Sequence, residues 1–171
     1  MIREAELKDI PAILEIFNDA VLNTTAIYAY KPATLEDRTA WFEKKREDGF
    51  PVLVFDVDGT VAGFAAYGTF RAFPAYKYTV EHSVYVYKDF RGRGIASQLV
   101  KRLIEIADGQ GLATMVAGID ADNEASILLH KKLGFKDCGT VKKAGFKFGR
   151  WLDLTFMQYE LKGPEKPVED R

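Results

Sequence analysis

The sequence predicts an α/β protein whose central sheet is mixed, mostly antiparallel, and flanked by helices. Runs rich in β-branched and aromatic residues alternate along the chain with segments in which apolar residues recur every three or four positions. Hairpin signals lie toward both ends, and Asp58-Gly59 between residues 52–56 and 61–67 is the clearest of them. Helices placed between strands, with a hairpin at either end, indicate a mixed sheet covered by helices.

The first part of the chain is expected to form a short strand and two helices. Residues 2–6 are the strand, and the helix that follows has Asp9 as its expected N-cap and Pro11 in its first turn. Thr34 and Asp37 have the spacing of a capping box and are expected to start the second helix. The first helix is indicated by an apolar stripe of Ile10, Ile13, Leu14, Phe17 and Val21. Residues 26–30 between the helices are apolar without clear periodicity, and either wall a pocket or form a packed connector.

The central stretch, residues 78–107, is predicted to be a strand, a turn and a helix. Residues 78–87 are β-branched and aromatic, and Asp89 marks the strand end. The helix is indicated by the spacing of Leu99, Val100, Leu103, Ile104 and Ala107. Between them, Arg91-Gly92-Arg93-Gly94 opens the helix, where unpaired N–H groups and the helix dipole favour an anion. This turn is read as a phosphate or pyrophosphate site, and a surface turn with solvated arginines is the alternative.

The last third of the chain is predicted to add a buried strand, a helix and two further strands. The strand spans residues 113–119, and the helix ends at Gly134 as its C-cap. The apolar positions that indicate this helix are Ala125, Leu128, Leu129 and Leu133. Residues 135–141 and 151–161 are the expected strands, with residues 144–150 as the turn between them.

Length, charge and cysteine content limit the class of protein. A chain of 171 residues suits one domain, expected at residues 1–161, while residues 162–171, with two prolines and alternating charge, are expected to be a disordered tail. Lys and Arg number 24 against 25 Asp and Glu, so neither a nucleic acid nor a membrane surface is an expected partner. The only cysteine, Cys138, permits no intrachain disulfide and no zinc spacing, so no metal is expected. It is read as a small packing residue. The charged start of the chain, without an apolar signal segment, favours the cytoplasm.

Four motifs in order resemble one enzyme family. Arg91-x-x-Gly94-x-Ala96 resembles the acyl-CoA pyrophosphate signature of the GCN5-related N-acetyltransferase superfamily, usually written Gln/Arg-x-x-Gly-x-Gly/Ala. Residues 79–86, 123–135 and 144–151 are similar to its phosphinothricin and L-methionine sulfoximine acetyltransferase branch. The resemblance covers residues 2–161 and implies the acyl-CoA N-acyltransferase fold, with acetyl-CoA as co-substrate. It also implies direct attack, in a ternary complex, by the α-amino group of L-methionine sulfoximine, methionine sulfone or phosphinothricin.

The resemblance assigns the cofactor-binding residues. The phosphates of coenzyme A are expected at the turn formed by Arg91, Gly92, Arg93, Gly94, Ile95, Ala96 and Ser97. The strand edge Val84-Tyr85-Val86 is expected to pair with the pantetheine arm, as peptides add to sheet edges, and Asn123 to hydrogen-bond that arm.

Glu81 and His130 are the expected catalytic residues. By position alone a solvated or ion-paired Glu81 is as good an interpretation, but the resemblance implies that Glu81 takes the proton from the substrate amine. His130 stands where the wider superfamily often has a tyrosine that protonates the leaving thiolate. Its role stays open between thiolate acid, second base and structural hydrogen bond. His82 is interpreted as a polar packing residue rather than as a residue that binds a ligand.

The substrate is expected beside the central strand. The loop with Arg71, Ala72 and Phe73 leads to that strand, and its guanidinium suits a carboxylate or an oxygen-bearing head group. The strand itself adds Glu81, His82 and Ser83. The aromatic and cationic residues 146–151 suggest a homodimer, and intrachain packing is the alternative. The competing functions are acetylation of another small amine or a peptide N-terminus, and a non-catalytic module that binds coenzyme A.

Overall fold

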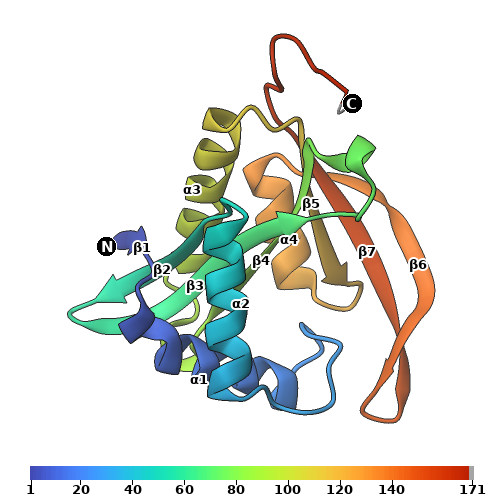
Figure 1. Ribbon diagram of the computed structural model, residues 1–171. Coiled ribbons are helices and arrows are strands. Elements are labelled where there is room, and N and C mark those ends of the chain that lie inside the picture. The colour runs from blue at the N-terminus through green and yellow to red at the C-terminus, as the bar shows by residue number, and fades with distance from the viewer. Residues whose placement is uncertain (170–171) are drawn as a thin grey trace.

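The computed structural model describes residues 1–169, in which seven strands form one sheet in the order β1-β2-β3-β4-β5-β7-β6 (Figure 1). Asp170 and Arg171, the end of the expected tail, lie outside the described residues. The strands are β1 (Ile2–Glu4), β2 (Val52–Val57), β3 (Thr60–Thr69), β4 (Thr79–Val86), β5 (Thr114–Asp120), β6 (Lys136–Lys147) and β7 (Arg150–Glu160). The helices are α1 (Ile10–Asn23), α2 (Leu35–Glu47), α3 (Ile95–Gly109) and α4 (Glu124–Leu133).

The fold class predicted from the sequence is confirmed. Only β4 and β5 pair in parallel among the described strands, and every other pair is antiparallel. The helices cover both faces of the sheet, and α2 lies across its front in Figure 1. Helix α3 packs on one face through the predicted stripe, all of it buried: Leu99, Val100, Leu103, Ile104 and Ala107. Helices α1 and α2 cover the other face with Ile10, Ile13, Ile16 and Phe42.

The sheet opens between its two parallel strands. Strand β4 pairs with β5 only from Thr79↔Thr114 to Glu81↔Val116. Beyond that point β4 stays paired with β3 as far as Val86, while β5 stays paired with β7 as far as Asp120. The second half of β4 therefore has an edge that β5 does not cover.

The helix starts differ in part from the prediction. The capping box is confirmed, because Thr34 Oγ1 accepts from the Asp37 N–H (3.1 Å) and the Asp37 carboxylate accepts from the Thr34 N–H (2.9 Å). Asp9 is the N-cap of α1 as predicted, although its side chain makes no capping hydrogen bond. Asp9 precedes α1, but its carboxylate accepts from the Arg3 guanidinium at 2.7 and 2.9 Å and from the Glu6 N–H. An ion pair with β1 takes the place of a side-chain cap, and the hydrogen bonds from the Arg3 guanidinium lower the pKa of the Asp9 carboxyl.

The predicted face of α4 was also partly wrong. Leu128 is 55% exposed, whereas His130 is buried and Ile127 and Leu133 pack on the core. The inward face of α4 thus follows the three-residue spacing 127, 130 and 133, with His130 buried and the other two partly buried. A pattern of apolar residues alone does not show this face, because its central position is a histidine. Gly134 is the left-handed C-cap as expected.

The β6–β7 hairpin is longer than predicted. Residues 144–147 and 150 belong to the strands, and Phe148-Gly149 alone forms the turn, both with positive φ (52° and 71°). Phe146 and Trp151 are therefore cross-strand partners, with ring centroids 5.2 Å apart. Register shifts after Asp137 and after Val141 interrupt the alternation of side chains, so the sequence pattern does not show the strand.

A buried lysine joins this hairpin to the first helix. Lys147 Nζ donates to three backbone carbonyls, those of Val21 (2.6 Å), Thr24 (2.8 Å) and Ile27 (2.7 Å). The carbonyls at a helix C-terminus carry the negative end of the dipole, so a cation is suited to this place. The segment that follows α1 is thereby fixed on β6.

The described part of the expected tail contacts the domain. The Lys162 N–H donates to the Asp108 carboxylate at 2.9 Å, and the Gly163 N–H donates to the Leu112 carbonyl at 3.1 Å. Further along, the Val168 N–H donates to the Tyr78 hydroxyl at 3.0 Å. Residues 162–169 thus run along the end of the sheet.

Candidate functional site

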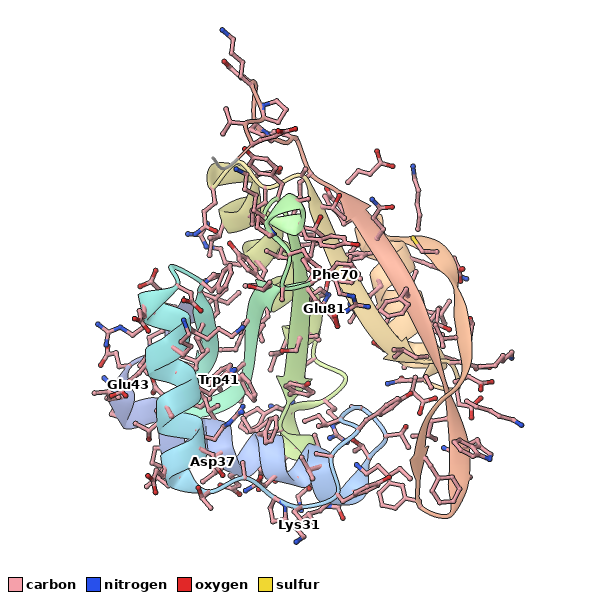
Figure 2. The ribbon with its side chains drawn as sticks, turned by 45° about the vertical axis from the view of Figure 1, so that its right-hand side comes forward. Lys31, Asp37, Trp41, Glu43, Phe70 and Glu81 are labelled. Atoms are coloured by element: carbon pink, nitrogen blue, oxygen red, sulfur yellow. The ribbon has the colours of Figure 1, made fainter. Side chains whose placement is uncertain are left out.

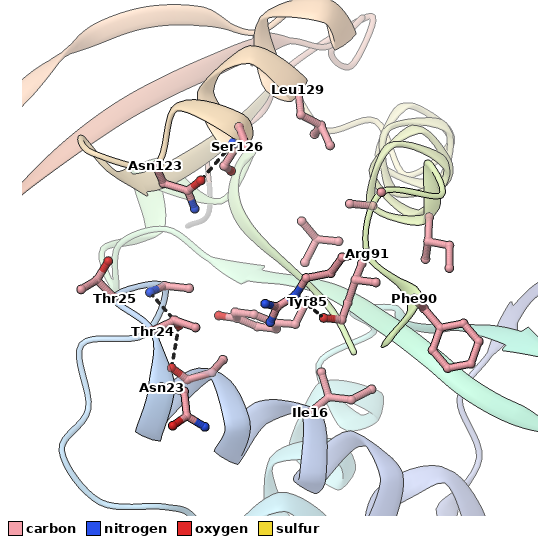
Figure 3. Close-up of a pocket in the computed structure, with 18 of the residues that line it drawn as sticks. Ile16, Asn23, Thr24, Thr25, Tyr85, Phe90, Arg91, Asn123, Ser126 and Leu129 are labelled. Atoms are coloured by element: carbon pink, nitrogen blue, oxygen red, sulfur yellow. Dashed lines mark hydrogen bonds between the residues drawn. The ribbon is translucent and has the colours of Figure 1, made fainter. Parts of the chain in front are cut away.

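Two cavities meet where β4 and β5 part. The larger has a volume of about 810 Å³ and lies between the end of α1, the second half of β4 and the first turns of α3 and α4 (Figure 3). The smaller, of about 300 Å³, lies between β4 and β5. Both are lined by Ala26, Val84, Tyr85, Asn123, Ser126 and His130. The shared walls make one site with two compartments.

The glycine turn at the start of α3 leaves open space at the larger cavity. Gly92 and Gly94 have φ of +76° and +73°, and no described atom lies within 4 Å of where a Cβ would stand on either. Gly94 is the N-cap of α3 and offers no side-chain cap to the first N–H groups of the helix. Backbone donors, a helix dipole and absent side chains together form a cradle that fits a pyrophosphate.

The two arginines of the turn are placed differently. Arg91 lines the larger cavity, where its Nε donates to the Val86 carbonyl (3.2 Å) and its Nη2 lies 3.6 Å from the Asp19 carboxylate. Arg93 donates to the Asp89 carbonyl (3.2 Å), lies over the Phe90 ring, and does not line the cavity. Among the other residues predicted for this turn, Ile95 and Ala96 line the cavity and Ser97 does not.

The strand edge and the N-terminus of α4 face each other across the larger cavity. Val84, Tyr85 and Val86 line one wall, on the part of β4 that β5 leaves unpaired. On the opposite wall, Asn123 Oδ1 accepts from the Ser126 N–H (3.1 Å) and caps α4 (Figure 3). This bond orients the Asn123 amide, whose NH₂ has no partner within residues 1–169.

Glu81 stands at the point where the sheet opens (Figure 2). It is half-buried and lines the smaller cavity with His82 and Ser83. Its Oε1 would lie 3.6 Å from a Cβ on Gly118, so the glycine leaves room beside the carboxylate. Burial raises the pKa of the Glu81 carboxyl, and the positive charge of Arg71 opposes that rise.

The predicted substrate loop lies outside both cavities. Arg71 is exposed, donates from Nη1 to the Phe70 carbonyl (3.2 Å) and lies over the Phe70 ring. Its charge is close enough to act on Glu81. Ala72 is exposed and Phe73 is 75% exposed, and the structure does not bring either to the cavity walls.

His82 and His130 form a buried pair that the sequence reasoning missed. Their Nε2 atoms are 3.0 Å apart, the ring centroids are separated by 5.1 Å, and the ring planes differ by 18°, so the rings meet edge to edge through these two nitrogens. His130 Nδ1 also lies 2.7 Å from the Ser126 carbonyl oxygen. Burial lowers the pKa of His130 and takes that of His82 down to about 3, so both rings are neutral at physiological pH. A separation of 48 residues leaves no local sequence signal for this contact.

Further lining residues were not anticipated as site residues. The last residue of α1, Asn23, and the segment after it, Thr24 to Ile27, line the cavities. The 26–30 segment therefore contributes to the wall of the site through Ala26 and Ile27. Asp120, buried at the end of β5, lines the smaller cavity and accepts from the Asp122 N–H. The polar run Asp120-Ala121-Asp122-Asn123 at the end of a buried strand is a sequence signal that could have pointed to Asp120. No such signal marks the segment at the end of α1.

Several other features bear on the kind of site. Cys138 is exposed on β6 and lines neither cavity, so its reading as a packing residue was wrong because β6 is the sheet edge. Within residues 1–169, no three His, Cys, Asp or Glu side chains are grouped so as to hold a metal ion. The described helices include none that is long and apolar enough to span a membrane.

Comparisons with known proteins agree with this architecture. The chain is 53% identical over 161 residues to the L-methionine sulfoximine/L-methionine sulfone acetyltransferase of Pseudomonas aeruginosa, covering 94% of each chain. The structure of yncA from Salmonella typhimurium, solved with its cofactor acetyl-CoA, matches with a TM-score of 0.94 at 46% identity, over 99% of this chain and 97% of that one. A phosphinothricin acetyltransferase from Sinorhizobium meliloti in complex with acetyl-CoA matches with a TM-score of 0.94 at 35% identity, over 100% and 93%.

The family model described as the acetyltransferase (GNAT) family matches residues 11–135, which span α1 to the start of β6 and include both cavities' principal walls. The glycine turn before α3, the two strands β4 and β5 that part, and the capped helix α4 all lie within the matched residues. The chain therefore belongs to the GNAT acetyltransferase family.

Proposed function

We propose that this protein transfers the acetyl group of acetyl-CoA to the α-amino group of a small amino-acid-like substrate, by direct attack in a ternary complex, with residues 1–161 as its single catalytic domain. The observation that carries the proposal is the position of Glu81, a half-buried carboxylate with a raised pKa in the smaller cavity, where β4 parts from β5. The names of the relatives, which act on methionine sulfoximine, methionine sulfone and phosphinothricin, support the substrate class.

The larger cavity fits acetyl-CoA, which when bound supplies an activated thioester. The residues 92–97 would hold the pyrophosphate through backbone N–H groups, with Arg91 adding positive charge. The free edge of Val84-Tyr85-Val86 and the Asn123 amide are placed to bind the pantetheine arm. A backbone N–H of the same edge would stabilise negative charge on the thioester oxygen.

Glu81 is the proposed general base. An amino-acid α-amine is largely protonated at neutral pH, and only its neutral form can attack a thioester. Because burial raises the pKa of Glu81, its carboxylate accepts a proton more readily at neutral pH than a solvated glutamate does. Direct attack needs no protein nucleophile, and Cys138 lies away from both cavities.

The geometry of His130 favours a structural role over the two catalytic alternatives. Both of its ring nitrogens already have partners, Ser126 on one side and His82 on the other. Neither nitrogen therefore has a free proton that it could donate to a group in the cavity. His130 is therefore proposed to shape the wall between the two cavities.

A homodimer in the cytoplasm completes the proposal. The tip of the β6–β7 hairpin, which ends the sheet on one side, exposes three large apolar side chains: Phe146 on the edge strand β6, Phe148 in the turn and Trp151 on β7. We propose that a second copy of the chain packs on this surface, which places the hairpin tip near a neighbouring active site. A free, exposed Cys138 is compatible with a reducing compartment. Sedimentation at micromolar concentration should give a dimer, and a monomer would remove this part of the proposal.

An amine panel tests the substrate class. With acetyl-CoA, we expect acetylation of L-methionine sulfoximine first, then methionine sulfone and phosphinothricin, and little turnover of simple alkylamines. Arg71 lines neither cavity, but its charge acts on Glu81, and we propose that it binds the substrate carboxylate there. Arg71→Ala should then reduce kcat/KM for these substrates at least about tenfold, corresponding to the low end of about 1.5 kcal/mol for a charged hydrogen bond. Arg102→Ala, on the exposed side of α3, is the control. Equal activity on alkylamines, or none on the three amino acids, contradicts the substrate assignment.

The pH profile tests the base. The active form of Glu81 is deprotonated, so kcat/KM should rise with pH through its pKa, at higher pH than for a solvated glutamate because burial raises that pKa. Glu81→Gln should lower kcat by roughly 10²–10⁴ and remove this limb, while acetyl-CoA still binds. Glu160→Gln, on the exposed end of β7, should change neither. A Glu81→Gln enzyme with the parental profile would exclude Glu81 as the base.

A glycine substitution tests the pyrophosphate cradle. Gly94→Val places a β-branched side chain at φ +73° in the open space of the turn, so the KM for acetyl-CoA should rise far more than the KM for the amine. Gly49→Val is the matched control, because Gly49 has φ +74° and equally open surroundings but lies at the end of α2. Both variants carry the backbone strain. Only the first should lose acetyl-CoA affinity, and an unchanged KM in folded Gly94→Val protein would refute the cradle.

A further inference from the structure

The two histidines of the chain are both buried and form one pair. His82 is 7% exposed on β4, directly after Glu81, and His130 is 2% exposed on α4. The edges of both rings contact the Phe135 ring, which closes the pair from the side of β6. The pair thus joins the strand of the proposed base to the helix capped by Asn123.

The hydrogen-bond partners fix the protons on both rings. A carbonyl oxygen can only accept, so the 2.7 Å contact with Ser126 requires the proton of His130 on Nδ1. A neutral His130 then has a lone pair on Nε2. The 3.0 Å contact between the two Nε2 atoms is a hydrogen bond only if His82 carries its own proton on Nε2 and donates it. His82 Nδ1 is left as a buried lone pair without a partner in residues 1–169.

The surroundings keep the pair neutral. Burial lowers the pKa of both rings, and the neighbouring His130 lowers that of His82 further, while the backbone of Ser83 at His82 and of Ser126 at His130 opposes the shift in part. Ser126 faces the pair from α4 and Phe135 from the turn before β6, and neither carries a charge. Glu81 lies on the opposite face of β4 because side chains alternate along a strand. Within the described chain no carboxylate pairs with either ring.

This arrangement leaves His130 without a proton to give. Its Nδ1–H is held by the Ser126 carbonyl, and its Nε2 lone pair is occupied by the His82 N–H. A general acid needs a proton that it can release toward the departing group, within hydrogen-bond reach. A leaving thiolate must therefore take its proton from elsewhere in the site.

We propose that His82 and His130 form one neutral positioning unit, in which His82 donates to His130 and fixes β4 against α4, and that His130 does not protonate the leaving thiolate. The role of the unit in catalysis rests on the proposed function, whereas its protonation pattern does not. The unit holds Glu81 and the wall of the thioester compartment in register. His82 lines the smaller cavity and also positions the wall of the site through its hydrogen bond to His130.

Nuclear magnetic resonance tests the protonation pattern without any activity assay. With only two histidines in the chain, long-range ¹⁵N–¹H spectra of the labelled protein report both rings without overlap. We expect a proton on Nδ1 of His130 and on Nε2 of His82 at neutral pH and above, with neither ring titrating near the ordinary histidine pKa of about 6.5. His130 protonated on Nε2, or titrating near the ordinary histidine pKa of about 6.5, would overturn the proposal.

Substitutions then separate positioning from acid catalysis. His130→Gln keeps an acceptor for His82 but has no titratable proton, so we expect kcat within about threefold of the parent. His130→Phe and His82→Phe leave a partner unpaired, and each should lower kcat by roughly ten- to a hundredfold, the scale of a misplaced site. The double variant should be no worse than the singles, because the two rings act together.

The alternative gives a different pattern. If His130 were the thiolate acid, His130→Gln and His130→Phe would fail alike, and both would lose the basic limb of the kcat profile, while His82→Phe would keep it. That result would overturn the proposal even if the phenylalanine variants were poorly folded, because His130→Gln and the spectra of the parent protein decide the case. If the parent enzyme transferred no acetyl group at all, the proposed function would be refuted, whereas the spectra would still test the protonation pattern of the two histidines.

Discussion

The parting of β4 from β5 after Glu81 is the constraint on which the site depends. Parallel pairing ends at Glu81↔Val116, and each strand then keeps its other neighbour, β3 or β7, to its end. An unpaired stretch of β4 has backbone groups that must find other partners, because a buried unpaired N–H or C=O is costly. The opening therefore both makes space for a ligand and leaves backbone donors and acceptors to bind it.

Neighbouring elements turn that opening into two compartments of different character. At one end, the glycine turn and the start of α3 offer backbone N–H groups and a positive dipole, in a protein whose net charge is only −1. At the other end lies a half-buried carboxylate, Glu81, whose charged form is disfavoured by burial. An anion is thus attracted to one compartment and a proton to the other. Local placement of charge, rather than overall charge, separates them.

Buried polar contacts hold the movable walls in place. Lys147 has three carbonyl partners on the segment after α1, and its stem runs along β6, so the hairpin and this wall form one body. Tyr28 packs on the same strand, where a Cβ on Gly145 would come within 2.7 Å of its ring. Such contacts are costly to break in part, because a cation or carbonyl left unpaired in the interior loses its solvation. The site is accordingly built on a rigid frame.

The sequence by itself determined the local elements: the hairpin at Asp58-Gly59, the Thr34 capping box, the apolar stripe of α3 and the glycine turn, because each depends on residues close together in the chain. The resemblance of four motifs identified the family. Only the tertiary structure decided where β4 leaves β5, that His82 meets His130, and that Lys147 reaches the end of α1. Those contacts join residues 35 to 126 positions apart, so they arise from strand order and helix packing, which no local pattern encodes.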